Sequence, residues 1–185
     1  MKSLCIFCGA RPGNNAIYTE VAVSFARLLA EKNIELIFGG GKVGLMGVLA
    51  DTVLTGGGKV QGVIPEGLMS EEVAHTGLTR LHVVDTMHLR KELMYNLSDG
   101  FVALPGGFGT LDEFFEILTW SQLGLHKKPI GFLNVNGYFN HLLNHFELAV
   151  KEGFVDKDLA NSILVETDIN IMLEKITSHS LNSDI

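Results

Sequence analysis

The chain alternates short apolar runs with longer segments in which apolar residues recur at helical spacing. Apolar runs of strand length cover residues 3–8, 34–38, 59–64, 81–84, 101–104, 129–133 and 163–165. The helical spacing predicts helices over residues 14–32, up to Leu54, over 86–97, from near Thr110, over 138–151 and over 169–176. Residues 66–79 show no periodicity and are predicted to form a loop. Strands that are apolar on both faces and alternate with helices predict a parallel sheet covered on both sides.

This pattern predicts an α/β fold, a single-domain Rossmann-like parallel sheet with helices on both faces. No internal repeat, linker or low-complexity tract divides the 185 residues. We expect residues 1–178 to form the domain and residues 179–185 to be a polar C-terminal tail with frayed structure. In such a sheet, ligands bind at the carboxyl ends of the strands.

A glycine-rich turn follows the apolar strand 101–104 at that edge. Pro105 opens it, and Gly106, Gly107, Phe108 and Gly109 lead to the helix expected near Thr110. Glycines lack a Cβ atom, so backbone N–H groups can close on a phosphate. The first turn of the helix adds unpaired N–H donors and the positive end of its dipole. The turn is therefore predicted to bind an anion.

Carboxylates narrow that interpretation. Asp112 and Glu113 are expected in the first turn of the helix, with Glu116 on the same face. A site built only for a dianion would not place acids beside it, because like charges repel. A phosphosugar would suit both the glycine turn and the carboxylates, with its phosphate on the N–H groups and its sugar beside a carboxylate. The alternative is a capping box, in which Thr110 caps the helix and Glu113 reaches back.

A second glycine loop follows the strand 34–38. Gly39, Gly41 and Gly44 fit a dinucleotide fingerprint by letter, but the acid expected about 20 residues later is missing. No P-loop sequence occurs either. The loop should share the sheet edge with the first one, so Gly40 and Gly41 are candidates for ligand contact. Close packing of strand against helix is the alternative.

Two adjacent cations, Arg90 and Lys91, stand near the start of the predicted helix 86–97. The helix dipole favours acids there, which suggests a role in holding a phosphate or polarising a sugar oxygen. A solvated helix face is the alternative. The seven histidines show no spacing typical of metal ligands.

Composition limits the class of protein. The net charge of −7 and the absence of a basic run argue against nucleic acid as a partner. The N-terminal apolar run is too short for a signal peptide and no run reaches membrane-spanning length, so a cytoplasmic protein is expected. Cys5 and Cys8 would point to opposite faces of a strand, and we expect buried thiols rather than a metal or redox pair.

The segment 105–113, Pro-Gly-Gly-Phe-Gly-Thr-Leu-Asp-Glu, resembles the PGGxGTxxE signature of the Lonely Guy family. These proteins are cytokinin riboside 5'-monophosphate phosphoribohydrolases, often mislabelled as lysine decarboxylases. A second family motif matches Met87-His88-x-Arg90-Lys91. The similarity extends through residues 120–124, 128–131 and 134–138, and covers the chain to about Glu166.

The resemblance implies hydrolysis of the N-glycosidic bond of purine or cytokinin nucleoside 5'-monophosphates, such as AMP and isopentenyladenosine monophosphate. The products would be free base and ribose 5-phosphate. By motif position, Arg90 and Glu113 take the catalytic roles. The remaining substrate and phosphate contacts that it implies are Glu72, Arg90, Lys91, Gly106, Gly107, Phe108, Gly109, Thr110 and Thr119. It also implies a homodimer and no metal or organic cofactor.

Two other functions compete with this one. A pyridoxal decarboxylase needs a Schiff-base lysine with supporting groups, and nothing in the sequence marks one. A non-catalytic nucleotide or phosphosugar sensor would keep the phosphate site and lack turnover.

The preferred base is a separate question: Met69 and Met87 could line the base pocket or pack in the core. Asp112 stands where many relatives have Glu, and residues 66–67 are Glu-Gly where plant members often have Lys and Thr.

Overall fold

The computed structural model describes residues 1–69 and 74–181. Within these ranges seven parallel strands form one sheet in the order β4-β3-β2-β1-β5-β6-β7. The strands are β1 (Ser3–Phe7), β2 (Glu35–Phe38), β3 (Val60–Pro65), β4 (Arg80–Val84), β5 (Phe101–Ala103), β6 (Ile130–Leu133) and β7 (Leu164–Glu166). The predicted α/β class is confirmed.

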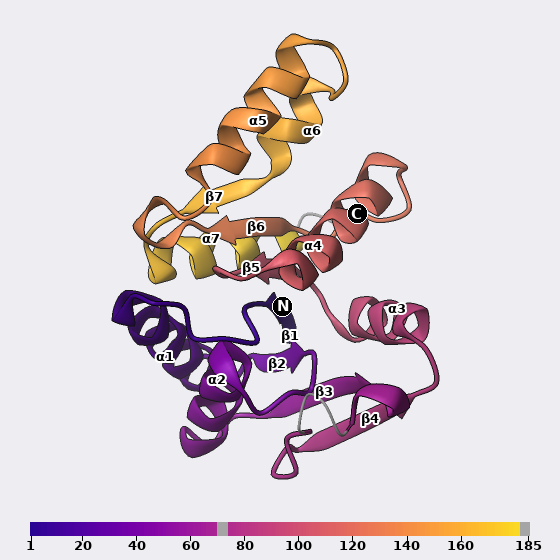
Figure 1. Cartoon of the computed structure of the whole chain (residues 1–185). Helices are drawn as coiled ribbons and strands as arrows, with labels where there is room; N and C mark the ends of the chain where they lie inside the picture. The colour runs from indigo at the N-terminus through magenta and orange to yellow at the C-terminus, as the bar shows by residue number, and fades with distance from the viewer. Residues whose placement is uncertain (70–73, 182–185) are drawn as a thin grey trace.

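Helices cover both faces of the sheet, as predicted (Figure 1). They are α1 (Ala16–Glu31), α2 (Gly44–Thr55), α3 (Met87–Leu97), α4 (Phe108–Gln122), α5 (Asn140–Lys151), α6 (Lys157–Ser162) and α7 (Ile169–Leu181). Two 3-10 turns, η1 (Glu66–Leu68) and η2 (Val135–Gly137), lie in loops. Helices α1, α2 and α7 share one hydrophobic core with the sheet, and α3, α4 and α5 share the other.

Strand β1 shows how the two cores are divided. Leu4, Ile6 and Cys8 face the core of α1, α2 and α7, whereas Cys5 and Phe7 face the opposite core. Side chains of a strand alternate between faces, so the two cysteines diverge as expected. Both are free, buried thiols.

The strand order places a ligand crevice at the centre of the sheet. From β1 the chain builds outward through β2, β3 and β4, then returns to the other side of β1 with β5. The loops after β1 and β5 therefore leave the sheet in opposite directions, and a crevice opens between them. The glycine turn at residues 105–109 follows β5 at this point.

Several boundaries differ from those predicted. Helix α4 begins at Phe108 rather than Thr110, so Asp112 and Glu113 lie in its second turn. Helix α6 was missed, because its six residues are too few to show a period. Helix α7 runs to Leu181, five residues past the predicted end and into the expected tail. None of the helices within the described ranges is long and apolar enough to span a membrane.

Candidate active site

A pocket of about 540 Å³ lies at the carboxyl ends of β1 and β5. Residues 9–13, from the loop after β1, form one wall, and residues 105–110 form another. The remaining lining residues are Cys8, Tyr18, Leu45, Met46, Arg90, Glu113 and Tyr138. The pocket therefore unites both predicted catalytic residues with the predicted phosphate turn.

The glycine turn at residues 105–109, which is the predicted phosphate turn, presents free backbone donors. Gly107 is the N-cap of α4 and offers no side chain to the first-turn N–H groups, which have no acceptor within the helix. A Cβ atom at Gly107 or Gly109 would meet nothing within 4 Å, so this backbone is open to a ligand. The capping-box alternative is wrong, because Thr110 lies inside the helix as its third residue.

Close packing fixes the base of this turn. A Cβ atom at Gly106 would lie 2.1 Å from Thr110 Oγ1 and 2.8 Å from the Gly9 backbone nitrogen. The Gly9 N–H donates to Pro105 O at 3.1 Å, so the two loops are joined directly. Phe108, by contrast, is 95% exposed at the rim of the pocket.

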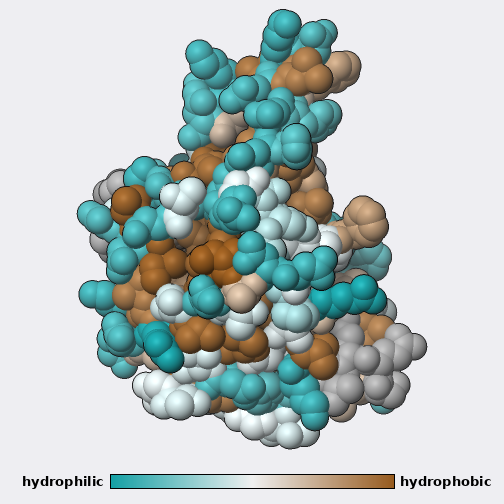
Figure 2. Space-filling view, turned by 60° about the vertical axis from the view of Figure 1, so that its left-hand side comes forward, coloured by the Kyte–Doolittle hydropathy of each residue, from teal (hydrophilic) through white to brown (hydrophobic). Residues whose placement is uncertain are grey.

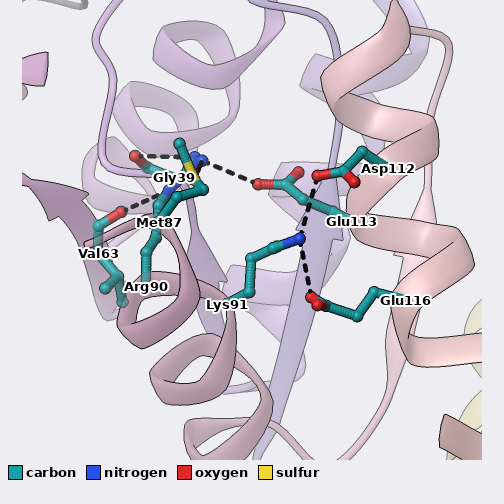
Figure 3. Close-up of polar contacts among 8 residues, drawn as sticks. All are labelled: Gly39, Val63, Met87, Arg90, Lys91, Asp112, Glu113 and Glu116. Atoms are coloured by element: carbon teal, nitrogen blue, oxygen red, sulfur yellow. Dashed lines mark hydrogen bonds and ion pairs between the residues drawn. The ribbon is translucent and has the colours of Figure 1, made fainter.

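Arg90 and Glu113 form an ion pair in the pocket wall (Figure 3). Arg90 Nη1 lies 3.1 Å from Glu113 Oε1, and the two side chains are 8% and 12% exposed. The Arg90 guanidinium also donates from Nε to Val63 O at 3.1 Å and from Nη2 to Gly39 O at 3.4 Å. It thus ties β3 and the residue after β2 to the carboxylate on α4.

Lys91 points to the same helix and lies between two of its carboxylates, Asp112 and Glu116 (Figure 3). Its ammonium lies 3.2 Å from Asp112 Oδ2 and 3.1 Å from Glu116 Oε2. Burial by itself lowers the pKa of Lys91, but hydrogen bonds and charge from Glu116 and Asp112 outweigh it and raise the pKa. The solvated-face alternative for Arg90 and Lys91 is wrong. None of Lys91, Asp112 and Glu116 is among the residues that line the pocket.

The second glycine loop, which begins at Gly39, mainly packs against residues of the site instead of lining the pocket. A Cβ atom at Gly39 would lie 2.1 Å from Arg90 Nη2, so glycine is required for Arg90 to reach its place. Gly44 has φ +62° and approaches the backbone of Ala10 so closely that a Cβ atom would be 2.3 Å from its carbonyl carbon. Leu45 and Met46 reach the pocket, whereas Gly40 and Gly41 are not among its lining residues.

Other candidate residues lie away from the pocket lining. Thr119 Oγ1 donates within α4 to Phe115 O at 2.7 Å. Met87 accepts a hydrogen bond at its sulfur from Arg90 Nη1 at 3.3 Å, and Met69 lies at the end of η1. Glu72 lies outside the described residues. No group of three or more His, Cys, Asp or Glu side chains in residues 1–69 and 74–181 could hold a metal ion.

The loop after β1 and two tyrosines also belong to the pocket, although the sequence did not predict them there. Residues 9–13, Tyr18 and Tyr138 all line the pocket. The signal for the loop was available, because Gly9 ends the first strand and Gly13 follows four residues later. Tyr138 comes from the loop after β6, and its place beside the pocket depends on strand order, which periodicity does not give.

Comparison with known proteins identifies close relatives. A family described as "possible lysine decarboxylase" matches residues 46–176. The cytokinin riboside 5'-monophosphate phosphoribohydrolase of Rhodococcoides fascians is 49% identical over 96% of this chain and 90% of its own length. The enzyme of that name, LOG1, from Arabidopsis thaliana is 42% identical, covering 96% of this chain and 84% of its own.

More distant solved structures share the fold. The molybdenum cofactor binding protein of Rippkaea orientalis has a TM-score of 0.70 at 21% identity, over 96% of this chain and 97% of that one. The molybdenum cofactor carrier protein of Chlamydomonas reinhardtii has a TM-score of 0.72 at 17% identity, over 96% of each chain. At these identities the likeness concerns the fold alone.

Proposed function

This chain belongs to the Lonely Guy family of cytokinin riboside 5'-monophosphate phosphoribohydrolases, and from that premise we propose that it cleaves purine nucleoside 5'-monophosphates. Water breaks the N-glycosidic bond and releases free base and ribose 5-phosphate. We include both AMP and N6-prenylated AMP among the substrates. The observation that carries the proposal is the buried Arg90–Glu113 pair beside an open helix N-terminus, in one pocket.

The N-terminus of α4 is the proposed phosphate site. The N–H groups of Gly107, Phe108, Gly109 and Thr110 are donors that a phosphate would satisfy, and the helix dipole favours its charge. The bare Cα atoms of Gly107 and Gly109 let the phosphate oxygens approach the backbone. With the phosphate anchored there, the ribose extends toward Glu113 on the next turn of the helix.

Glu113 is the proposed catalytic carboxylate. Breaking the bond from C1' to the base nitrogen leaves the bonding electrons on the base and develops positive charge on the sugar ring. An anionic carboxylate beside C1' stabilises that charge, and it can orient and accept a proton from the water that attacks C1'. Arg90 fixes the direction of the Glu113 carboxylate through the 3.1 Å ion pair.

A homodimer is part of the proposal. Several large apolar side chains are largely exposed in the single chain: Phe108, Leu123, Leu125 and Phe154 are 95, 67, 64 and 83% exposed. Figure 2 shows hydrophobic side chains gathered in the middle of one face, between hydrophilic ones. Exposed apolar surface of this kind is typical of a face that packs against another subunit. A cytoplasmic location remains a prediction from the sequence.

The test is a chromatographic assay of purified protein with AMP and, separately, isopentenyladenosine monophosphate. Free base and ribose 5-phosphate should appear in equal amounts from both. Glu113→Gln should reduce turnover by at least about 100-fold while nucleotide still binds, because Gln keeps the shape but not the charge. Glu174→Gln, on the exposed face of α7, is the matched control and should keep full activity. Binding without any turnover by the wild type would favour the sensor.

A further inference from the structure

We propose that Tyr138 is a positioning residue that orients the Gly106–Gly107 peptide toward the substrate's phosphate. This inference rests on the proposed function, because it concerns the phosphate site of the same reaction. Tyr138 lies outside α4, directly after η2 in the loop that follows β6. It is one of the pocket-lining residues.

The inference is based on a single short hydrogen bond. The Tyr138 hydroxyl donates to Gly106 O at 2.6 Å. A trans peptide is planar, so its C=O and N–H groups point in opposite directions. Holding the Gly106 carbonyl on the Tyr138 side therefore turns the Gly107 N–H away from Tyr138. Within the described residues, no acceptor takes a hydrogen bond from that N–H.

Without this bond the peptide could rotate on its Gly107 side. Gly106 is closely packed against Thr110 and Gly9, but at Gly107 no atom lies within 4 Å of the position a Cβ would take, and glycine tolerates a wide range of φ. Rotation would direct the carbonyl oxygen, the negative end of the peptide dipole, toward the anion. The substrate would then lose one N–H donor and face a repulsive oxygen. The Tyr138 hydroxyl selects the orientation that binds.

Tyr138 is itself held firmly. Asn134, a buried residue, accepts at Oδ1 from the Phe139 N–H at 2.8 Å and donates from Nδ2 to Asn140 Oδ1 at 2.8 Å. Phe139 is buried and packs on Phe132, with ring centroids 4.5 Å apart. These contacts hold residues 134–140 in a tight turn, and Tyr138 lies within that turn.

The turn is also conformationally costly. Asn136 and Gly137 both have positive φ, at +52° and +68°. Gly137 adopts this region without steric cost, so the strain lies at Asn136, and a strained residue persists where surrounding contacts enforce it. On its far side the Tyr138 ring meets Tyr18 edge to face, with centroids 5.7 Å apart. The turn and the contact with Tyr18 thus direct the hydroxyl toward Gly106, although Tyr138 is 45% exposed.

Tyr138→Phe tests the proposal, because it removes the hydroxyl and keeps the ring contacts. We expect KM for AMP to rise about tenfold, the equivalent of one good hydrogen bond, with kcat changed by less than about twofold. The affinity for ribose 5-phosphate, measured by calorimetry, should fall by a similar factor. Tyr95→Phe, in α3 and packed against Trp120, is the matched control and should change neither quantity.

A purely packing role for Tyr138 predicts that Tyr138→Phe is silent in KM and in ribose 5-phosphate affinity, and that result would overturn the inference. An equal loss of affinity for ribose, which has no phosphate, would also overturn the inference, because the effect of Tyr138→Phe would then not depend on the anion. If wild-type protein binds ribose 5-phosphate but turns over no nucleotide, the proposed function fails and calorimetry still decides the role of Tyr138. Wild-type protein that binds no ribose 5-phosphate would overturn the Tyr138 inference.

Discussion

Arg90 on α3 and Glu113 on α4 meet at 3.1 Å in the wall of the pocket, each with little of its side chain exposed. The pair brings together two helices that are separated in the sequence by β5 and the phosphate turn. The ion pair fixes the direction of the Glu113 carboxylate.

Arg90→Lys should be far from conservative. The guanidinium reaches Glu113, Val63 O and Gly39 O together, whereas a lysine ammonium offers its donors at one point. We expect a loss of about 2 kcal/mol in the free energy of unfolding, from backbone carbonyls left without donors. Activity on AMP should fall by about 100-fold or more. Urea denaturation and steady-state kinetics measure both, with Arg27→Lys on the exposed face of α1 as the control.

Gly39→Ala should disable the site from a distance. The new methyl group would lie 2.1 Å from Arg90 Nη2, so the guanidinium must move and Glu113 loses its partner's alignment. Displacement of a catalytic group by about 1 Å can cost about 100-fold in rate. We expect kcat/KM for AMP to drop by that order. Gly67→Ala, where a Cβ atom meets nothing within 4 Å, should retain activity. Equal kinetics for the two variants would show that Arg90 tolerates the shift.

Stability should fall below about pH 6.5 because of His126. Burial lowers the pKa of His126, the hydrogen bond to Ile117 O opposes this, and the charge of Lys128 lowers the pKa further. The unfolded chain then binds a proton that the folded chain resists. The free energy of unfolding is therefore unaffected by His126 above about pH 6.5, and it falls as the pH drops from that value toward the lower pKa of the folded state.

His126→Asn provides the check. The shorter amide can still accept from the Lys128 N–H, as Nδ1 does at 3.1 Å, but it does not titrate. The difference in unfolding free energy between pH 7.5 and pH 5.5 should shrink, by up to about 1.4 kcal/mol per pH unit. His82, whose pKa burial also lowers, supplies the pH dependence that remains. An unchanged difference would contradict the role assigned to His126.

Both cysteines should resist alkylation in the folded protein. Burial raises the pKa of Cys5 and of Cys8, with the negative charge of Glu113 adding to each, so little thiolate forms near neutral pH. The thiolate is the reactive form. With iodoacetamide at pH 7.5, we expect modification to be slow and to accelerate when urea unfolds the chain. Mass spectrometry at each urea concentration follows it, and rapid labelling of the native protein would refute this prediction.

The α/β class and the glycine turn could be predicted because their signals are local. Apolar runs and helical spacing lie within one segment each, and the open N–H groups of α4 follow from the glycines at 106, 107 and 109. The start of α4 could not be fixed in this way. Glycine is a poor helix former, so Gly109 does not signal a helix by itself, and the structure nevertheless begins α4 at Phe108.

The sequence by itself determined the layered fold, the divergence of Cys5 and Cys8, and the candidacy of Arg90 and Glu113 through motif resemblance. Only the tertiary structure decided which loops share the pocket. Strand order places the loop after β1 beside the one after β5, brings Tyr138 onto Gly106, and sets Gly39 under Arg90. It also directs Lys91 to Asp112 and Glu116, away from the pocket lining. These are contacts between distant segments, and periodicity along the chain carries no information about which parallel strands become neighbours.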